Sequence, residues 1–374
     1  MGKVLNIAVI GCGEVAQCVH LPNLKTNHEQ YKVTALCDVS LDALKLCSER
    51  FHVENTFTSV SEMLDSSVPI DAVFILSTHE YHAEQIVQCA KAGKHVLVEK
   101  PMAQTLDEAD RVEKARVESG VVVFVGYMRR YARALDRLKE AIKGKEIKYV
   151  RVRDIIGDNP MFTSQTGMHL RYFSDIPPAA RSDLAARQQA NLATKLGAER
   201  ASQDPRNAQG FALLTTLGCH DLSAMRDVLG MPQKCLFASR SDDPLPSGPP
   251  GGRGSFWWNM VFQYPAFKAY YEMAIDHVGL FDAHIEVYTD DSRVKIQYDT
   301  PYVKGLPITL TVQSQLPNGD YSSQTTRPTY LDPYVLEMQE FYEAITEGKE
   351  FKTTVLDAKQ DIVLAKMIFD ALVD

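Results

Sequence analysis

The start of the chain most constrains the fold, because an apolar run there passes through two glycines into a helix-forming stretch. Residues 4–10 form the apolar run expected of a strand buried on both faces, and Gly11-Cys12-Gly13 leads into a helix predicted near residues 14–24. The alternation then continues, with strands predicted at 33–37, 72–76, 95–98 and 121–125 and helices at 41–51, 82–92 and 105–119. Alternating units with short connections predict a parallel, doubly wound sheet, and hence an α/β fold.

The pattern changes after about residue 147. Strands are predicted at 147–156, 256–264, 268–276, 284–288 and 294–298, and they indicate a large, mostly antiparallel sheet. The polar helix predicted at 182–196 lacks a clear apolar stripe, so we expect it to lie over the surface as an insertion. Residues 241–255, SDDPLPSGPPGGRGS, are typical of a flexible loop. Further helices are predicted at 220–229, 333–346 and 355–372.

The length of 374 residues favours more than one domain. We expect the doubly wound domain to span residues 1–128 and an α+β domain with the large sheet to span residues 129–332. Residues 333–374 are predicted to be C-terminal helices that pack back on the body.

Charge and cysteine usage exclude several classes of protein. The net charge of −8 argues against a nucleic-acid partner and against an anionic membrane. No apolar run reaches the roughly 20 residues that span a bilayer, and the early strand leaves no room for a signal peptide. The seven cysteines are scattered and never form CxxC, which favours reduced thiols over a disulfide framework or a zinc site. We therefore expect a cytoplasmic protein without a metal site.

The glycine turn has the pattern of a dinucleotide-binding motif, G-x-G-x-x-A, written here as Gly11, Cys12, Gly13, Glu14, Val15 and Ala16. The first glycine makes the tight turn, the second lets a pyrophosphate approach, and the helix N-terminus offers it N–H groups. Asp38 follows the second strand, where this fold places the carboxylate that binds the adenosine ribose. A carboxylate there repels a 2′-phosphate, which favours NAD, with NADP possible. The alternatives are a glycine turn without a ligand and an aspartate that only caps a helix.

A charged pair ends the strand predicted at residues 95–98. Glu99 and Lys100 precede Pro101, which stops the strand because it has no N–H, and residues 105–108 form a capping box for the next helix. In a parallel sheet this turn lies at the carboxyl edge, where ligands bind. The alternative is a solvated surface pair.

Together these motifs resemble the glucose–fructose oxidoreductase / inositol dehydrogenase / rhizopine-catabolism (Gfo/Idh/MocA) family. The segments that carry the resemblance are STHEYHAEQIVQCAKAGKHVLVEKP (residues 77–101) and LGCHDLSAMRDVLG (residues 217–230). The resemblance covers essentially the whole chain and implies a Rossmann domain for NAD(P) followed by a substrate domain. It also implies that Lys100 points towards the nicotinamide and the substrate hydroxyl, with Glu99 beside the cofactor ribose.

His220 lies where the family carries a second proton-handling residue. The family segment usually reads D-x-x-x-H, and Thr216 stands here in place of the aspartate. Asp221 faces about 100° away on a helix, so it is a poor substitute partner. We expect His220 and Thr216 to contact the substrate, with Lys100 carrying more of the acid–base chemistry. The alternative for His220 is a capping or core histidine.

The resemblance implies further cofactor contacts. Thr78, His79 and His82 match the segment that lines the nicotinamide ribose, although His79 stands where proline is common. Residues 127–131, YMRRY, match a stretch that often reads F-N-x-R-F, so Arg130 is the expected cofactor-binding arginine. A salt-bridged structural role is the alternative for Arg130.

These features predict an NAD-dependent oxidoreductase that acts on a secondary alcohol of a sugar, a cyclitol or a related polyol. The alternatives are an NADP-dependent aldose or dihydrodiol reductase and a non-catalytic NAD-sensing regulator. The adjacent aromatic pairs Trp257-Trp258 and Tyr270-Tyr271 place aromatic side chains on both faces of the large sheet. We therefore expect a homodimer or a larger homo-oligomer that associates through this sheet.

Overall fold

The computed structural model describes residues 2–197, 204–241 and 256–373. These residues form two compact units. Unit 1 contains Met1–Tyr127, Gly167–Ala198 and Tyr334–Ile362, and unit 2 contains Met128–Thr166, Glu199–Pro333 and Val363–Asp374. The domain boundaries predicted from the sequence stay a prediction. Residues 242–255 of the predicted loop lie outside the described part of the chain.

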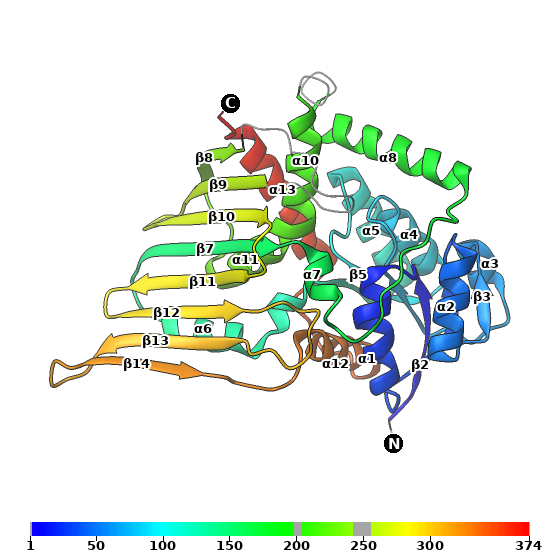
Figure 1. The fold of residues 1–374 in the computed structure, drawn as a ribbon, viewed down its shortest axis with the longest axis horizontal. Helices are drawn as coiled ribbons and strands as arrows, with labels where there is room; N and C mark the ends of the chain where they lie inside the picture. The colour runs from blue at the N-terminus through cyan, green and yellow to red at the C-terminus, as the bar shows by residue number, and fades with distance from the viewer. Residues whose placement is uncertain (1, 198–203, 242–255, 374) are drawn as a thin grey trace. The chain divides into compact units, whose positions relative to one another are not determined.

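Unit 1 is built on a six-stranded parallel sheet with the order β3-β2-β1-β4-β5-β6 (Figure 1). Its strands are β1 (Leu5–Ile10), β2 (Tyr31–Cys37), β3 (Asn55–Phe57), β4 (Ala72–Ile75), β5 (His95–Glu99) and β6 (Val123–Gly126). The strand order reverses between β1 and β4, and ligands of doubly wound sheets bind at the carboxyl ends of the strands at such a point. The fold class predicted for this part of the chain is confirmed.

Two helices of unit 1, α2 and α5, begin at side-chain caps that are visible in the sequence. Ser40 caps α2 through a hydrogen bond from the Ala43 N–H (3.0 Å), and Thr105 and Glu108 form the predicted capping box of α5. The elements are a π-helical turn η1 (Ala16–His20), α1 (Leu21–Thr26), α2 (Leu41–Phe51), α3 (Val60–Asp65), α4 (His82–Lys91), α5 (Leu106–Ser119), α8 (Pro178–Leu196), α12 (Pro333–Thr346) and the first part of α13 (Val355–Asp370).

The core of unit 1 joins the sheet to the returning C-terminal segment. Phe341 of α12 lies edge-on to Phe74 of β4 and to Phe124 of β6, each with 5.6 Å between ring centroids. Phe351 stacks on Phe124 at 4.9 Å, and the Tyr31 hydroxyl donates to the Met338 carbonyl (2.5 Å). Residues more than 200 positions apart therefore complete one apolar layer.

Unit 2 is built on an eight-stranded sheet with the order β14-β13-β12-β11-β7-β10-β9-β8. Its strand pairs are antiparallel except for β7 and β10, which run parallel. The strands are β7 (Ile147–Gly157), β8 (Lys234–Arg240), β9 (Phe256–Gln263), β10 (Lys268–Asp276), β11 (Phe281–Thr289), β12 (Ser292–Tyr298), β13 (Thr309–Gln315) and β14 (Tyr321–Thr326). The predicted large, mostly antiparallel sheet is confirmed.

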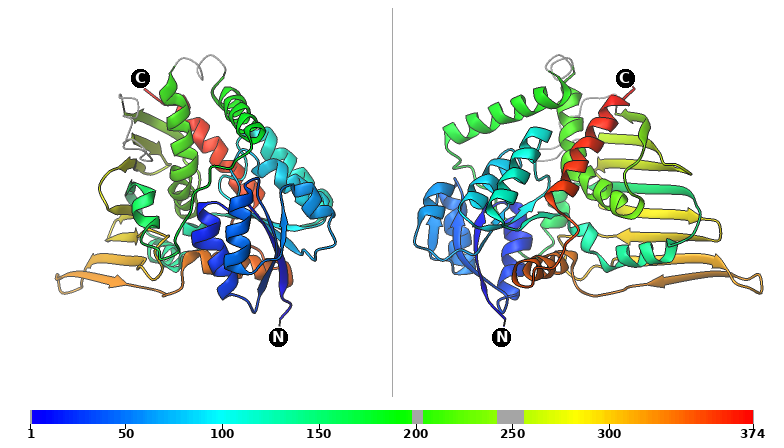
Figure 2. Two further views of the ribbon diagram at one scale, coloured as in Figure 1. Left: turned by 45° about the vertical axis from the view of Figure 1, so that its right-hand side comes forward. Right: turned by 180° about the vertical axis from the view of Figure 1, so that it is seen from behind.

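Helices of unit 2 cover one face of this sheet. The helical elements are η2 (Met128–Tyr131), α6 (Arg133–Ile142), α7 (Asn159–Thr163), α10 (Pro205–Leu213), η3 (Leu214–Gly218), α11 (Cys219–Leu229) and the end of α13. Figure 2 shows α6 and α11 on one face of the sheet. On the covered side Trp258 and Tyr271 are fully buried, whereas Trp257 and Tyr270 on the other side are 41% and 40% exposed.

The predicted polar helix is present as α8, and none of its described side chains is buried. It belongs to unit 1, where Arg187 lies over the Tyr81 ring (4.5 Å) and pairs with Glu84 (2.9 Å). Within the described residues, the chain contains no helix with the length and apolarity needed to cross a bilayer.

Candidate functional site

The glycine turn at the carboxyl end of β1 has the geometry of a phosphate cradle. Gly11 has φ +95°, and a Cβ there would lie 2.6 Å from the Leu76 carbonyl carbon, so a side chain is excluded. At Gly13 an added Cβ would meet no atom within 4 Å, which leaves the backbone open at the N-terminus of the first helix. This open approach beside β4 fits a pyrophosphate, which helix N–H groups bind.

Asp38 connects the end of β2 to this turn. Its carboxylate accepts from the Cys12 N–H (2.7 Å) and from the Ser40 N–H (2.9 Å). Burial raises the pKa of Asp38 above its usual range, while the two N–H groups oppose that shift. The alternative that Asp38 caps the following helix is wrong, because the N-cap of α2 is Ser40. Asp38 instead fixes the glycine turn at the place where an adenosine ribose binds in this fold.

The predicted catalytic turn follows β5 and is held from two sides. The buried Glu99 carboxylate lies 2.8 Å from His20 Nε2 and accepts from the Lys100 N–H (3.3 Å). Burial alone acts to raise the pKa of Glu99, but the hydrogen bond from His20 and the charges of His20 and Lys100 hold it below its usual value. The Lys100–Pro101 peptide is cis, and Lys100 is half-buried. The Lys100 backbone is therefore anchored at the carboxyl edge of the sheet.

His82, at the start of α4, holds the other side of this turn. One ring nitrogen lies 2.9 Å from the Pro101 carbonyl oxygen and the other lies 2.9 Å from the Ser77 carbonyl oxygen. The ring is 1% exposed, and burial lowers the pKa of His82. His82 thus ties the turn after β4 to the turn after β5, which is a positioning role. Its predicted contact with a cofactor stays a prediction.

Thr78 and His79 lie in the turn after β4. Thr78 is exposed, and its carbonyl accepts from the Tyr81 N–H (3.0 Å). His79 is half-buried, with Nε2 3.1 Å from a Glu80 carboxylate oxygen. Unit 1 therefore brings together all the predicted residues of the glycine turn and of the turns after β2, β4 and β5, and Glu14 and Val15 begin the first helix among them.

The other predicted residues, Arg130, Thr216 and His220, belong to unit 2. Arg130 is buried and pairs with Asp227 (3.3 Å), as the structural alternative for this arginine requires. The Thr216 hydroxyl donates to the Ala212 carbonyl (2.7 Å), and His220 is half-buried in the first turn of α11. The predicted roles of these three residues stay predictions.

A buried ion cluster next to His220 could not be predicted from the sequence. Arg129 is 2% exposed and donates to Asp154 (3.1 Å) and, through a shorter contact, to Asp221. Its guanidinium also lies over the rings of Phe281 (5.5 Å) and Tyr298 (5.2 Å). Burial raises the pKa of Asp221 well above its usual range. Because Asp221 faces Arg129, it does not replace the aspartate that the family has at position 216.

His20 and Gln17, on the first helix, were missed as well. Both are fully buried, and Gln17 donates to the Cys12 carbonyl (2.9 Å) within the glycine turn. Polar residues inside an otherwise apolar helix were the available signal, because buried polar groups need partners.

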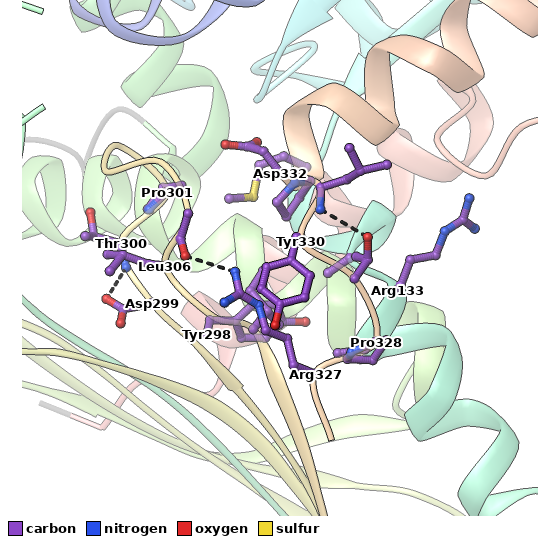
Figure 3. A pocket seen from close by; sticks show the side chains of 18 of the residues that line it. Arg133, Tyr298, Asp299, Thr300, Pro301, Leu306, Arg327, Pro328, Tyr330 and Asp332 are labelled. Atoms are coloured by element: carbon purple, nitrogen blue, oxygen red, sulfur yellow. Dashed lines mark hydrogen bonds between the residues drawn. The ribbon is translucent and has the colours of Figure 1, made fainter. Parts of the chain in front are cut away.

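A separate pocket lies in unit 2, among the loops at the ends of the strands (Figure 3). Arg327 lies over the Tyr330 ring at 4.1 Å and donates to the Gly305 carbonyl (2.9 Å), and Asp299 accepts from the Thr300 N–H (2.7 Å). Arg130, Thr216 and His220 do not line this pocket. This pocket therefore contains none of the predicted site residues.

The parallel sheet, the open glycine turn and the acidic end of β2 define a dinucleotide-binding Rossmann domain. Residues 5–127 match the model of a family described as an oxidoreductase family with an NAD-binding Rossmann fold, Gfo/Idh/MocA. This match covers about a third of the 374 residues. Myo-inositol 2-dehydrogenase of Thermotoga maritima is 33% identical over 156 residues, which are 42% of this chain and 46% of that protein.

A second relative, inositol 2-dehydrogenase/D-chiro-inositol 3-dehydrogenase of Shouchella clausii, is 31% identical over 140 residues, 37% of this chain and 40% of that protein. The matches thus span less than half the length of these curated relatives. Two solved structures share the fold over 99% of this chain. They are a 3-ketoreductase from Actinomadura kijaniata with NADP and TDP-benzene (18% identity, 98% of that chain, TM-score 0.70) and myo-inositol 2-dehydrogenase from Lactobacillus plantarum (19%, 97%, 0.68).

Proposed function

We propose that this protein is an NAD-dependent oxidoreductase that transfers a hydride between nicotinamide and a carbinol carbon of a sugar, cyclitol or related polyol. The observation that carries the proposal is the anchored Glu99-Lys100-Pro101 turn, which shares unit 1 and its carboxyl sheet edge with the open glycine turn. Inositol dehydrogenases among the relatives support the substrate class.

The residues of unit 1 have different proposed roles in cofactor binding and proton transfer. The Gly13 backbone and the first helix would hold the pyrophosphate, and Asp38 would meet the ribose. Bound nicotinamide would supply the hydride acceptor. Lys100 would hold the substrate hydroxyl, and its amine form would take the hydroxyl proton as hydride leaves the neighbouring carbon for nicotinamide. The ammonium group formed in this way would stabilise the charge that develops on the oxygen. Glu99, fixed by His20, keeps the Lys100 backbone in place.

His220 is proposed as the second proton-handling residue, with Thr216 contacting the same substrate. Position 216 carries a threonine hydroxyl in place of the carboxylate that would make an imidazole more basic. Lys100 therefore carries the larger share of proton transfer. Arg130 is proposed to help hold the cofactor end of the site.

The test uses the full-length protein. Calorimetric titration with NAD and with NADP measures which of the two dinucleotides binds. Turnover of a panel of polyols and sugar acids is then followed at the absorbance band of reduced nicotinamide. Turnover with NAD and a polyol supports the proposal. Binding of NAD without turnover on any panel member would favour a sensor, and NADP-dependent reduction of an aldose would favour the reductase alternative.

We also propose self-association through the uncovered face of the eight-stranded sheet. Trp257 and Tyr270 are both about two-fifths exposed there, beside a ladder in which Arg151 and Arg153 each pair with Glu272 (3.0 and 2.9 Å). An aromatic, arginine-rich surface is typical of an interface core. A second copy of the chain is the proposed cover.

A further inference from the structure

Residues 168–175, which precede α8, run along the glycine turn and α2 within unit 1. The Gln17 side chain binds the backbone of Arg171 in the middle of this segment. It accepts from the Arg171 N–H and donates to the Arg171 carbonyl, both at 3.0 Å. Arg50 of α2 donates to the carbonyls of Met168 (2.8 Å) and His169 (3.2 Å). These contacts fix the segment beside the predicted adenosine end of the dinucleotide site.

The segment delivers a carboxylate to the N-terminus of α2. One oxygen of Asp175 accepts from the Ser40 hydroxyl (2.5 Å) and the other accepts from the Asp42 N–H (3.0 Å). These two hydrogen bonds lower the pKa of Asp175, so the group is ionised at neutral pH. Burial is the largest influence on the pKa of Asp38, and the hydrogen bonds that Asp38 accepts come next. The negative charge of Asp175 is a smaller influence, and it helps to raise this pKa. Two carboxylates therefore share the end of β2.

This position decides between two forms of the cofactor. Rossmann domains that take NADP accommodate the 2′-phosphate near the end of β2, with a cation close by. Hydroxyl and N–H donors at a helix N-terminus would suit such a phosphate. Here Ser40 and Asp42 already donate to Asp175, and the Arg50 guanidinium donates to backbone carbonyls. The Ser40 and Asp42 donors are thus occupied by a group of the same charge as the phosphate, and the Arg50 guanidinium is held by backbone carbonyls.

We propose that Asp175 is a specificity-determining residue that excludes the 2′-phosphate of NADP from the N-terminus of α2. The inference rests on the proposed function, because it concerns the cofactor of that site. Asp38 and Asp175 then act together, Asp38 at the ribose and Asp175 at the position next to it. The segment that precedes α8 thus supplies a cofactor-selecting residue from a distant part of the sequence.

Calorimetric titration of Asp175→Asn in the full-length protein tests the inference. We expect the NADP dissociation constant to fall about three- to tenfold at low ionic strength, because exposed charges interact modestly and are screened by salt. The NAD dissociation constant should stay within about threefold of that of the unmodified protein. Asp175→Lys should lower the NADP dissociation constant further than Asp175→Asn does. Asp175→Glu should restore most of the discrimination. Added salt should narrow the difference between the NAD and NADP dissociation constants in the unmodified protein, and it should do so less in Asp175→Asn, a change that a purely structural role for Asp175 would not produce.

Asp107→Asn is the matched control, since Asp107 is an exposed aspartate in the first turn of α5. If the NADP dissociation constant falls as much in this control as in Asp175→Asn, the effect is a general one of net charge and the inference is overturned. If Asp175→Asn binds NAD but has an unchanged ratio of NADP to NAD dissociation constants, the inference is overturned while the proposed function stands. A protein that binds neither dinucleotide would overturn the proposed function, and the inference with it.

Discussion

Replacing His20 by alanine should destabilise the Rossmann unit strongly. His20 is fully buried, its Nε2 lies 2.8 Å from the Glu99 carboxylate, and its ring packs edge-on to Phe74 (5.8 Å) and Tyr334 (5.5 Å). Alanine would leave a buried carboxylate without this partner. Breaking a buried pair in this way costs about 3–5 kcal/mol. Because a domain of about 150–250 residues shifts its Tm by about 2–4 °C per kcal/mol, we expect a loss of about 6–20 °C.

The loss should depend on pH in a definite direction. The native environment holds the pKa of Glu99 below its usual value, so its ionisation contributes stability above the unfolded pKa of about 4.3, and this contribution is lost as pH falls through the native pKa. In His20→Ala the hydrogen bond that opposes burial is gone, so the pKa of Glu99 should rise. The deficit should therefore be largest near neutral pH and should shrink on acidification, when protonation removes the buried charge.

Thermal unfolding of the full-length protein, followed by calorimetry over a series of pH values, measures both effects. His20→Gln is the matched variant, because its amide can still donate to Glu99, and it should recover much of the loss. His28→Ala, which removes an exposed imidazole, should leave Tm unchanged within about 2 °C. A His20→Ala protein that melts like the unmodified one, or whose deficit is the same at every pH, would refute this account of the Glu99 turn.

Three further variants test the site and the proposed interface. Lys100→Met should keep NAD affinity and lower turnover by at least about 100-fold, as expected for a positioned proton-transfer group, and kinetics within a few-fold of the unmodified enzyme would remove Lys100 from the mechanism. Asp38→Ala should weaken NAD binding by about tenfold or more and should raise the affinity for NADP relative to NAD, because it removes the repelling charge and frees the Cys12 N–H. Titration with both cofactors measures this preference, and an unchanged preference would contradict the role of Asp38. Trp257→Arg with Tyr270→Arg should produce monomers in light scattering, and a monomeric unmodified protein at micromolar concentration would contradict the interface.

Local patterns in the sequence were sufficient to predict the α/β fold and several elements of the site. The glycine turn, the capped helix after Pro101 and the alternating strands of the large sheet depend on neighbouring residues, so short windows reveal them. The short β3 and the polar edge strand β14 escaped prediction, because a three-residue strand and a sequence such as YSSQTT carry little hydrophobic period.

Long-range pairings could not be predicted. Nothing near Asp175 in the sequence indicates that it meets Ser40, 135 positions earlier, and nothing near Arg129 indicates Asp221. The choice of Arg130 over Arg129 followed the family pattern. In the structure both arginines are buried, and Arg129 pairs with two carboxylates whereas Arg130 pairs with Asp227. Such contacts depend on tertiary packing, which local periodicity does not encode.

The return of α12 and of residues 347–362 to unit 1 bears on how the protein folds during synthesis. All six strands of the Rossmann sheet have been made by residue 126, but the rings of Phe341 and Phe351 that cover Phe74 and Phe124 come more than 200 residues later. At about 5–20 residues per second, translation leaves that apolar face uncovered for on the order of tens of seconds. We expect the nascent N-terminal sheet to depend on chaperones during this interval, and a chain truncated after β6 to aggregate rather than to bind a dinucleotide.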